Sequence, residues 1–309
     1  MSKVLVSQRD AYGEALLALG KQDERILALT ADLSSSTRID KFARKFPERF
    51  FNLGVAEQNA VGVAAGLALE GFIPFLSSFA VFIPGRCFDQ IRVSVCQNKA
   101  NVKLVGSHLG FSNSGDGASA QSIADIGLMR VLPGMVVLSP ADANEVRGAV
   151  AAMVAHQGPI YMRISRSKTP LLTKRGKKFK IGKAEIMRRG KKLTIVGTGP
   201  ILTKALAAAN KLNAEVINCS TIKPLDKATI VSSAKKTGRV LVLEEHSVLG
   251  GLGAAVAEFL SQEYPIPLKI MGIPDVFGES ARDPEALYQK YGLTEEKIME
   301  EGKKLISNF

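Results

Sequence analysis

Short apolar runs alternate along the chain with longer stretches that have helical periodicity, and polar or glycine-rich clusters separate them. In the first half, the apolar runs predict strands near residues 26–30, 50–52, 72–76, 102–106, 135–138 and 160–164. Helical patterns fall between them, at about 7–20, 38–45, 57–71, 86–97 and 142–155. This alternation predicts about six β–α units before residue 170.

The same alternation resumes after a break. Strands are expected near 193–197, 214–218, 240–243 and 268–271, with helices at 202–212, 227–234, after 250 and in the tail. Between the two series, ten of the nineteen residues from 174 to 192 are Lys or Arg. We therefore predict a two-domain α/β protein. Residues 1–170 form a mainly parallel, doubly wound sheet, 171–190 a basic linker and 191–309 a smaller α/β domain.

Composition agrees with a soluble protein of this class. A chain of 309 residues can bury two cores, and 46% hydrophobic residues with 28 glycines suit α/β folds. Cys87, Cys96 and Cys219 are too far apart for a ligand pair or disulfide framework, which favours a reducing cytoplasm. The start lacks a signal pattern, and Glu70 interrupts the longest apolar run, so no membrane span is expected.

The net charge of +12 raises the question of nucleic-acid binding. No aromatic ladder accompanies the basic residues, so a solvated linker or partner-facing surface is favoured over nucleic acid. Gly197 and Gly199 form half of a dinucleotide fingerprint, but Pro200 follows and the third glycine is missing. A nicotinamide cofactor is therefore not expected.

Glu57 is the only charge between Arg49 and Glu70, and it opens a helix made mostly of Ala, Gly, Val and Leu. A carboxylate at this position is favoured by the helix dipole, which is an ordinary structural explanation. Alternatively, the helix is buried through its small residues, in a core or an interface, and Glu57 faces a ligand. A buried carboxylate needs a hydrogen-bond partner, so we expect one beside Glu57.

Several other polar or aromatic residues fall at the carboxyl ends of predicted strands, where open α/β sheets bind ligands. They are Asp32, Ser36, Phe79, Phe82, His108, Asp116 and Arg166. Each also has a structural explanation: Ser36 can cap a helix, Phe79 and Phe82 can belong to the core, and His108 can be an ordinary satisfied side chain. Arg9 lies in the first turn of a helix, where a cation opposes the dipole, which indicates another role or simple exposure to solvent.

Taken together, these motifs resemble the C-terminal half of transketolases across essentially the whole chain. The matching segments, in order, are Gly54-Val55-Ala56-Glu57-Gln58, Phe79-x-x-Phe82, Ser107-His108, Gly115-Asp116-Gly117-Ala118-Ser119, Ser165-Arg166 and Gly278-Glu279-Ser280-Ala281. The resemblance implies a pyrimidine-binding domain of the thiamine diphosphate enzymes up to about residue 170. It also implies the small C-terminal domain of the same family from about residue 191.

The resemblance suggests a role for each matching position. Glu57 would hydrogen-bond the aminopyrimidine ring of thiamine diphosphate and favour its imino tautomer, with Phe79 and Phe82 as an aromatic wall and Asp32 nearby. His108 would act in catalysis and, with Arg9, Ser36 and Arg166, hold a sugar phosphate, while Asp116 would contact a donor hydroxyl. Arginine suits phosphate because it can donate two parallel hydrogen bonds.

Three departures from the family pattern matter. Ala120 stands where many relatives have a donor-contacting histidine or glutamine, and Gly85 where some have a third aromatic residue. The diphosphate- and metal-binding half is missing. Gly115-Asp116-Gly117 imitates the start of the metal motif, but only the lone Asn144 follows nearby, so no metal site is expected in this chain.

The resemblance therefore implies one subunit of a split transketolase. An N-terminal partner subunit would supply the diphosphate site and its Mg or Ca ion, and two copies of each chain would form an α2β2 assembly that acts on sugar phosphates. Three alternatives stay open: the beta subunit of a 2-oxo acid dehydrogenase, a fragment similar to deoxyxylulose-phosphate synthase, and a non-catalytic scaffold subunit of the same fold.

Overall fold

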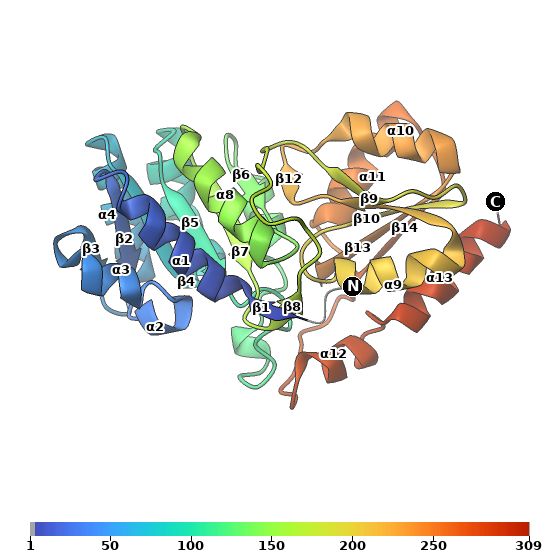
Figure 1. The fold of residues 1–309 in the computed structure, drawn as a ribbon, viewed down its shortest axis with the longest axis horizontal. Coiled ribbons are helices and arrows are strands. Elements are labelled where there is room, and N and C mark those ends of the chain that lie inside the picture. Colours follow the sequence, from blue (N-terminus) through green and yellow to red (C-terminus); the bar gives the residue numbers. More distant parts are fainter. Residues whose placement is uncertain (1–3, 309) are drawn as a thin grey trace.

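The computed structural model describes residues 4–308, which form two α/β lobes side by side (Figure 1). The blue-to-green lobe comes from the first half of the chain, and the yellow-to-red lobe from the second half. Each lobe has a central sheet with helices on both faces, as the alternation of strand and helix patterns predicts.

The first sheet has seven strands among the described residues. In spatial order they are β12 (Thr221–Lys223), β6 (Val136–Leu138), β7 (Ile160–Ile164), β5 (Lys103–Ser107), β4 (Ile73–Phe79), β2 (Ile26–Thr30) and β3 (Phe50–Asn52). All neighbouring pairs are parallel except β12 with β6. The prediction of a mainly parallel sheet is therefore confirmed.

Helices cover both faces of this sheet. On one face, α1 (Gln8–Gly20) and α8 (Ala143–Ala155) pack with Phe75 and Met162 in one apolar cluster. On the other, α4 (Glu57–Leu69), α7 (Asp125–Arg130) and the π-helix η2 (Ile91–Gln97) share a second cluster. Shorter elements complete the lobe: α2 (Ser34–Thr37), α3 (Asp40–Lys45), η1 (Pro47–Arg49), α5 (Ile83–Arg86), α6 (Phe88–Gln90) and η3 (Ala118–Ala120).

The second sheet has the order β14 (Leu268–Ile273), β13 (Val240–Ser247), β10 (Leu193–Gly197), β11 (Ala214–Asn218) and β9 (Glu185–Arg188). Only β9 runs antiparallel. Its helices are α9 (Leu202–Leu212), α10 (Lys227–Thr237), α11 (Leu252–Glu263), α12 (Pro284–Lys290) and α13 (Glu295–Asn308). The last part of the predicted linker is thus an edge strand of this sheet.

Two pairings join segments that are far apart in the sequence. β1 (Leu5–Ser7) pairs antiparallel with β8 (Lys168–Pro170), which brings the two ends of the first domain together. β12 comes from the second half of the chain but extends the first sheet beside β6. The two lobes therefore share backbone hydrogen bonds, which periodicity within one segment does not reveal.

The helix that begins at Glu57 is only half-buried within this chain. Ala60, Ala64 and Ala68 pack into the core, whereas Leu69 is 63% exposed and Gly62 and Gly66 have no neighbour within 4 Å of where a side chain would begin. One face is thus buried in the core, as expected, whereas burial of the other face in an interface stays a prediction. The core face is lined with alanines, and the opposite face is apolar and open.

Candidate functional site

The predicted site residues lie at the carboxyl edge of the first sheet. Asp32, Phe79, His108 and Arg166 come just at or after the ends of β2, β4, β5 and β7, which are consecutive neighbours in the sheet. Because these strands are parallel, their ends meet on one side of the molecule. The sheet therefore collects side chains that are more than 130 residues apart in the sequence.

Glu57 is buried, and its partner is Arg86. The side chain of Glu57 is 5% exposed, and Nη1 of Arg86 donates to its two carboxylate oxygens at 3.1 and 3.0 Å. The Arg86 guanidinium also lies 4.1 Å from the centroid of the Phe82 ring, in a cation–π contact. The expected hydrogen-bond partner thus exists, but the sequence analysis did not identify it.

An aromatic chain runs from this pair to His108. Phe82 stacks on Phe79 with ring centroids 5.4 Å apart, and Phe79 contacts the His108 ring at 4.2 Å. The Nδ1 atom of His108 is 2.8 Å from the hydroxyl of Ser107. Glu57, through Arg86, and His108 therefore lie at opposite ends of one aromatic wall.

His108 also adjoins a group of arginines. Burial, followed by the charges of Arg9 and Arg166, lowers the pKa of His108 to about 3. Burial and the nearby Arg38 and Arg166 likewise lower the pKa of Arg9, whose Nη1 donates to the backbone carbonyl of Ser36 at 2.7 Å. These cations raise one another's energy, so the cluster is suited to an anion and holds its histidine neutral at physiological pH.

Two of the predicted site residues have unusual backbone conformations. Asp32 has φ of 61° and His108 has φ of 71°, a left-handed region that costs energy for side chains larger than glycine. Asp32 is exposed, and its carboxylate accepts a hydrogen bond from Asn52 at 3.2 Å rather than touching the other predicted residues. Arg38, Lys99 and Asn213 share this conformation, so it does not by itself mark a functional residue, and the roles of Asp32 and His108 stay predictions.

The loop around Asp116 packs against the C-terminal domain. Ala281 N donates to the carbonyl of Ser114 at 3.0 Å, and Gln121 Nε2 donates to that of Glu279 at 2.8 Å. The two motif segments named in the sequence therefore lie together. Asp116 itself is exposed and makes no hydrogen bond or ion pair with the described residues.

A buried polar network next to the site was not expected from the sequence. Nε of Arg163 lies 2.9 Å from Asp125, with both side chains 1% exposed, and Tyr161 donates to the same carboxylate at 2.7 Å. Arg163 also donates to the carbonyl of Glu245 on β13 at 3.2 Å. The sequence did contain a signal for it. Arg163 lies within the buried strand Ile160–Ile164, and a buried charge requires a partner.

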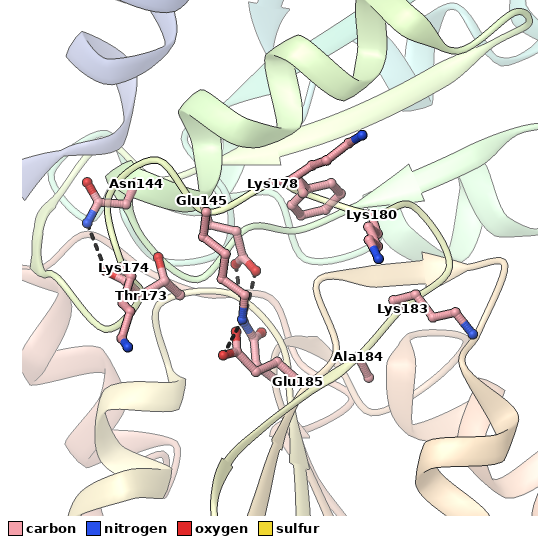
Figure 2. A pocket seen from close by; sticks show the side chains of 12 residues that line it. Asn144, Glu145, Thr173, Lys174, Lys178, Lys180, Lys183, Ala184 and Glu185 are labelled. Atoms are coloured by element: carbon pink, nitrogen blue, oxygen red, sulfur yellow. Dashed lines mark hydrogen bonds and ion pairs between the residues drawn. The ribbon is translucent and has the colours of Figure 1, made fainter.

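A separate cavity lies under the basic linker (Figure 2). It has a volume of about 270 Å³ and is lined by residues including Lys174, Lys177, Lys180 and Glu145. Its buried carboxylate, Glu145, already accepts hydrogen bonds from Ala141 N and from the Asn218 amide. None of the predicted site residues lines this cavity, so it is distinct from the group formed by Glu57, Phe82 and His108.

Residues 4–308 contain neither a cluster of metal ligands nor a membrane-spanning helix. No three His, Cys, Asp or Glu side chains are grouped so that they could hold a metal ion. None of the helices in that range has both the length and the apolar character needed to cross a bilayer.

Comparison with known proteins places this geometry in a family. Residues 5–170 match the transketolase pyrimidine binding domain, and residues 182–298 match the transketolase C-terminal domain. The chain is 43% identical over 98% of its length to a putative transketolase C-terminal section of Methanocaldococcus jannaschii, covering 99% of that protein. It is 41% identical over 94% of its length to a 6-deoxy-6-sulfo-D-fructose transketolase subunit of Clostridium sp. (strain MSTE9), covering 92%.

Among solved structures, a split gene transketolase described as an inactive beta4 tetramer aligns with a TM-score of 0.89 and 46% identity, covering 98% of each chain. The chain therefore belongs to the transketolase family, and the predicted fold and family are confirmed. Its close homologues are subunits of split transketolases. Members of this family use thiamine diphosphate.

Proposed function

We propose that this chain is the C-terminal subunit of a split, cytoplasmic transketolase. Together with an N-terminal subunit, it transfers a two-carbon ketol group from a ketose phosphate to an aldose phosphate. The observation that carries the proposal is the buried Glu57 carboxylate at the end of an aromatic wall, beside a cluster of arginines. The relatives support a transferase role, and the rival 2-oxo acid dehydrogenase and deoxyxylulose-phosphate synthase functions are not favoured.

The residues fit the pyrimidine half of thiamine diphosphate. Glu57 offers a buried acceptor whose one described hydrogen-bond donor is a half-exposed side chain, and Phe82 offers a ring face for stacking. When bound, the cofactor supplies the carbon that accepts the two-carbon unit. Glu57 holds a proton at the pyrimidine nitrogen, and Phe82 holds the ring in place.

The arginine cluster suits the phosphate of the substrate. Arg9 and Arg166 lie close enough to depress the pKa of His108, so a phosphate between them would offset their mutual repulsion. His108 stays neutral there and can hydrogen-bond a sugar hydroxyl as donor or acceptor. Asp32 and Asp116 complete the proposed site, Asp32 beside the cofactor and Asp116 at a donor hydroxyl.

The open face of α4 supports the need for a partner. Val55, just before the helix, is 77% exposed and Leu69, at its far end, is 63% exposed, although monomeric proteins rarely leave such apolar surface uncovered. A partner subunit would cover this face and supply the diphosphate site with its Mg or Ca ion, in an assembly of two copies of each chain.

The test is reconstitution. The purified chain with thiamine diphosphate and magnesium should show no ketol transfer, whereas adding the N-terminal subunit should restore it. Activity is measured by coupled assay with a panel of ketose phosphate donors, and pyruvate decarboxylation serves as the rival reaction. Full activity of the single chain would overturn the split-subunit proposal. Inactivity of the reconstituted pair with every donor would favour a scaffold role.

A further inference from the structure

The Arg86 side chain, which pairs with Glu57, ends in a small flat group that resembles an aminopyrimidine ring in shape. Phe82 and Arg86 are four residues apart on one helical turn, which places the guanidinium over the aromatic face. A guanidinium is planar and delocalised, and it donates through nitrogen, as an aminopyrimidine does. Here it stacks at 4.1 Å on Phe82 and donates to Glu57 at 3.0 Å.

We propose that Arg86 is a built-in stand-in for the aminopyrimidine ring and sets the affinity for the cofactor. This rests on the proposed function, in which the ring stacks on Phe82 and bonds to Glu57. Two flat groups cannot share one ring face and one carboxylate, so the guanidinium must leave when the ring arrives. Arg86 is then a positioning residue that keeps Glu57 paired and oriented in the free protein.

The structure allows this exchange. The Arg86 side chain is 45% exposed, so it can turn into solvent and regain hydration. Its backbone is held separately, because Gln58 Nε2 donates to the Arg86 carbonyl at 2.8 Å. Only the side chain therefore needs to move. Glu57 has no second donor among the described residues, so departure of the guanidinium without an arriving ring leaves a buried carboxylate unpaired.

Competition of this kind lowers the apparent affinity for the cofactor by the fraction of time that the site is free. If the guanidinium occupies the site about nine-tenths of the time, its removal tightens binding about tenfold. A purely structural role predicts the opposite, since the loss of an ion pair loosens the site.

The experiment uses the full chain reconstituted with its N-terminal subunit, and measures the dissociation constant of thiamine diphosphate with Mg²⁺ by calorimetry. R86M keeps the length of the side chain but removes the guanidinium, and should bind about tenfold more tightly. R92M is the matched control, because Arg92 lies nearby in an exposed pair with Asp89, and its affinity should stay within about twofold. E57Q should bind at least about tenfold more weakly.

The outcomes separate the two proposals. If E57Q weakens binding while R86M equals the wild type or binds more weakly, the stand-in is refuted and the proposed function stands. If E57Q binds as well as the wild type, the proposed role of Glu57 fails. R86L, which likewise removes the guanidinium and leaves no cation beside Glu57, should also tighten binding and serves if R86M does not fold by circular dichroism. A crystal structure with cofactor bound and Arg86 still on Glu57 would likewise refute the stand-in.

Discussion

Among the carboxylate–arginine pairs of the described residues that have a buried acid, Glu57–Arg86 and Asp125–Arg163 differ in the exposure of the arginine. Arg86 is 45% exposed beside Glu57, whereas Arg163 is 1% exposed beside Asp125. Asp125 also accepts from Tyr161, and Arg163 also donates to two backbone carbonyls, so that pair is held within the protein, although Oδ1 of Asp125 is buried without a hydrogen bond from the described residues. The comparison separates a fully buried structural pair from one whose half-exposed cation would, in the proposed exchange, give way to a ligand.

The largest effect is expected at the Asp125–Arg163 pair. R163M should lower the free energy of unfolding by about 3–5 kcal/mol, because it leaves Asp125 buried without its cation. Urea unfolding followed by circular dichroism measures the change. As a control, R92M removes an exposed cation and should change the free energy of unfolding by less than about 0.5 kcal/mol. A loss below 1 kcal/mol for R163M would abolish the distinction between the pairs.

Substitution at the Glu57–Arg86 pair should instead reduce activity and leave stability nearly unchanged. E57Q should reduce ketol transfer by the reconstituted enzyme at least about 100-fold, since the amide no longer holds a proton at the ring nitrogen. Its unfolding free energy should change by less than about 1 kcal/mol, because Arg86 can reach water. An E57Q enzyme with normal turnover, measured beside the wild type, would remove Glu57 from the mechanism.

A smaller effect is expected at His108. Its pKa is about 3 in the folded chain against about 6.5 when unfolded, so between these values only the unfolded state binds the proton. Stability from this group is therefore complete above pH 6.5 and falls as the pH is lowered. At pH 5 the loss is at most about 2 kcal/mol.

H108Q has no imidazole to take up a proton in the unfolded state. Its free energy of unfolding should therefore depend less on pH between 7.5 and 5. The comparison at pH 7.5, where neither form titrates, controls for packing changes. Parallel wild-type and variant profiles would mean that His108 is not held neutral by its surroundings.

Much of the fold follows from local pattern. The buried strand Ile26–Thr30 and the helix Gln8–Gly20 each carry their own periodicity, and Ser7 caps that helix by accepting from Asp10 N. The strands β1, β9 and β12 were not predicted, because they stand outside the β–α alternation that revealed the equally short β3 and β6, and their partners lie far away in the sequence. Non-local pairing leaves no periodic trace within such short segments.

The candidate site was predicted in part. Residues at strand ends were found because parallel strands gather their ends, but Arg86 was missed because its partner Glu57 is 29 residues away. The position of Arg86 four residues after Phe82 did predict a cation–π contact, because that spacing places the two side chains on one face of a helix. Whether Asp116 contacts a sugar depends on the bound state and not on any contact within this chain.

The pairing of β1 with β8 has a consequence for synthesis on the ribosome. It adjoins the contact in which Ser165 N donates to Gln8 at 2.7 Å, between residues 157 positions apart. At ordinary translation rates the later segment emerges on the order of ten seconds after the earlier one. During that interval the nascent chain presents Arg9 without Arg166. The arginine cluster is therefore completed only as the end of the first domain leaves the exit tunnel.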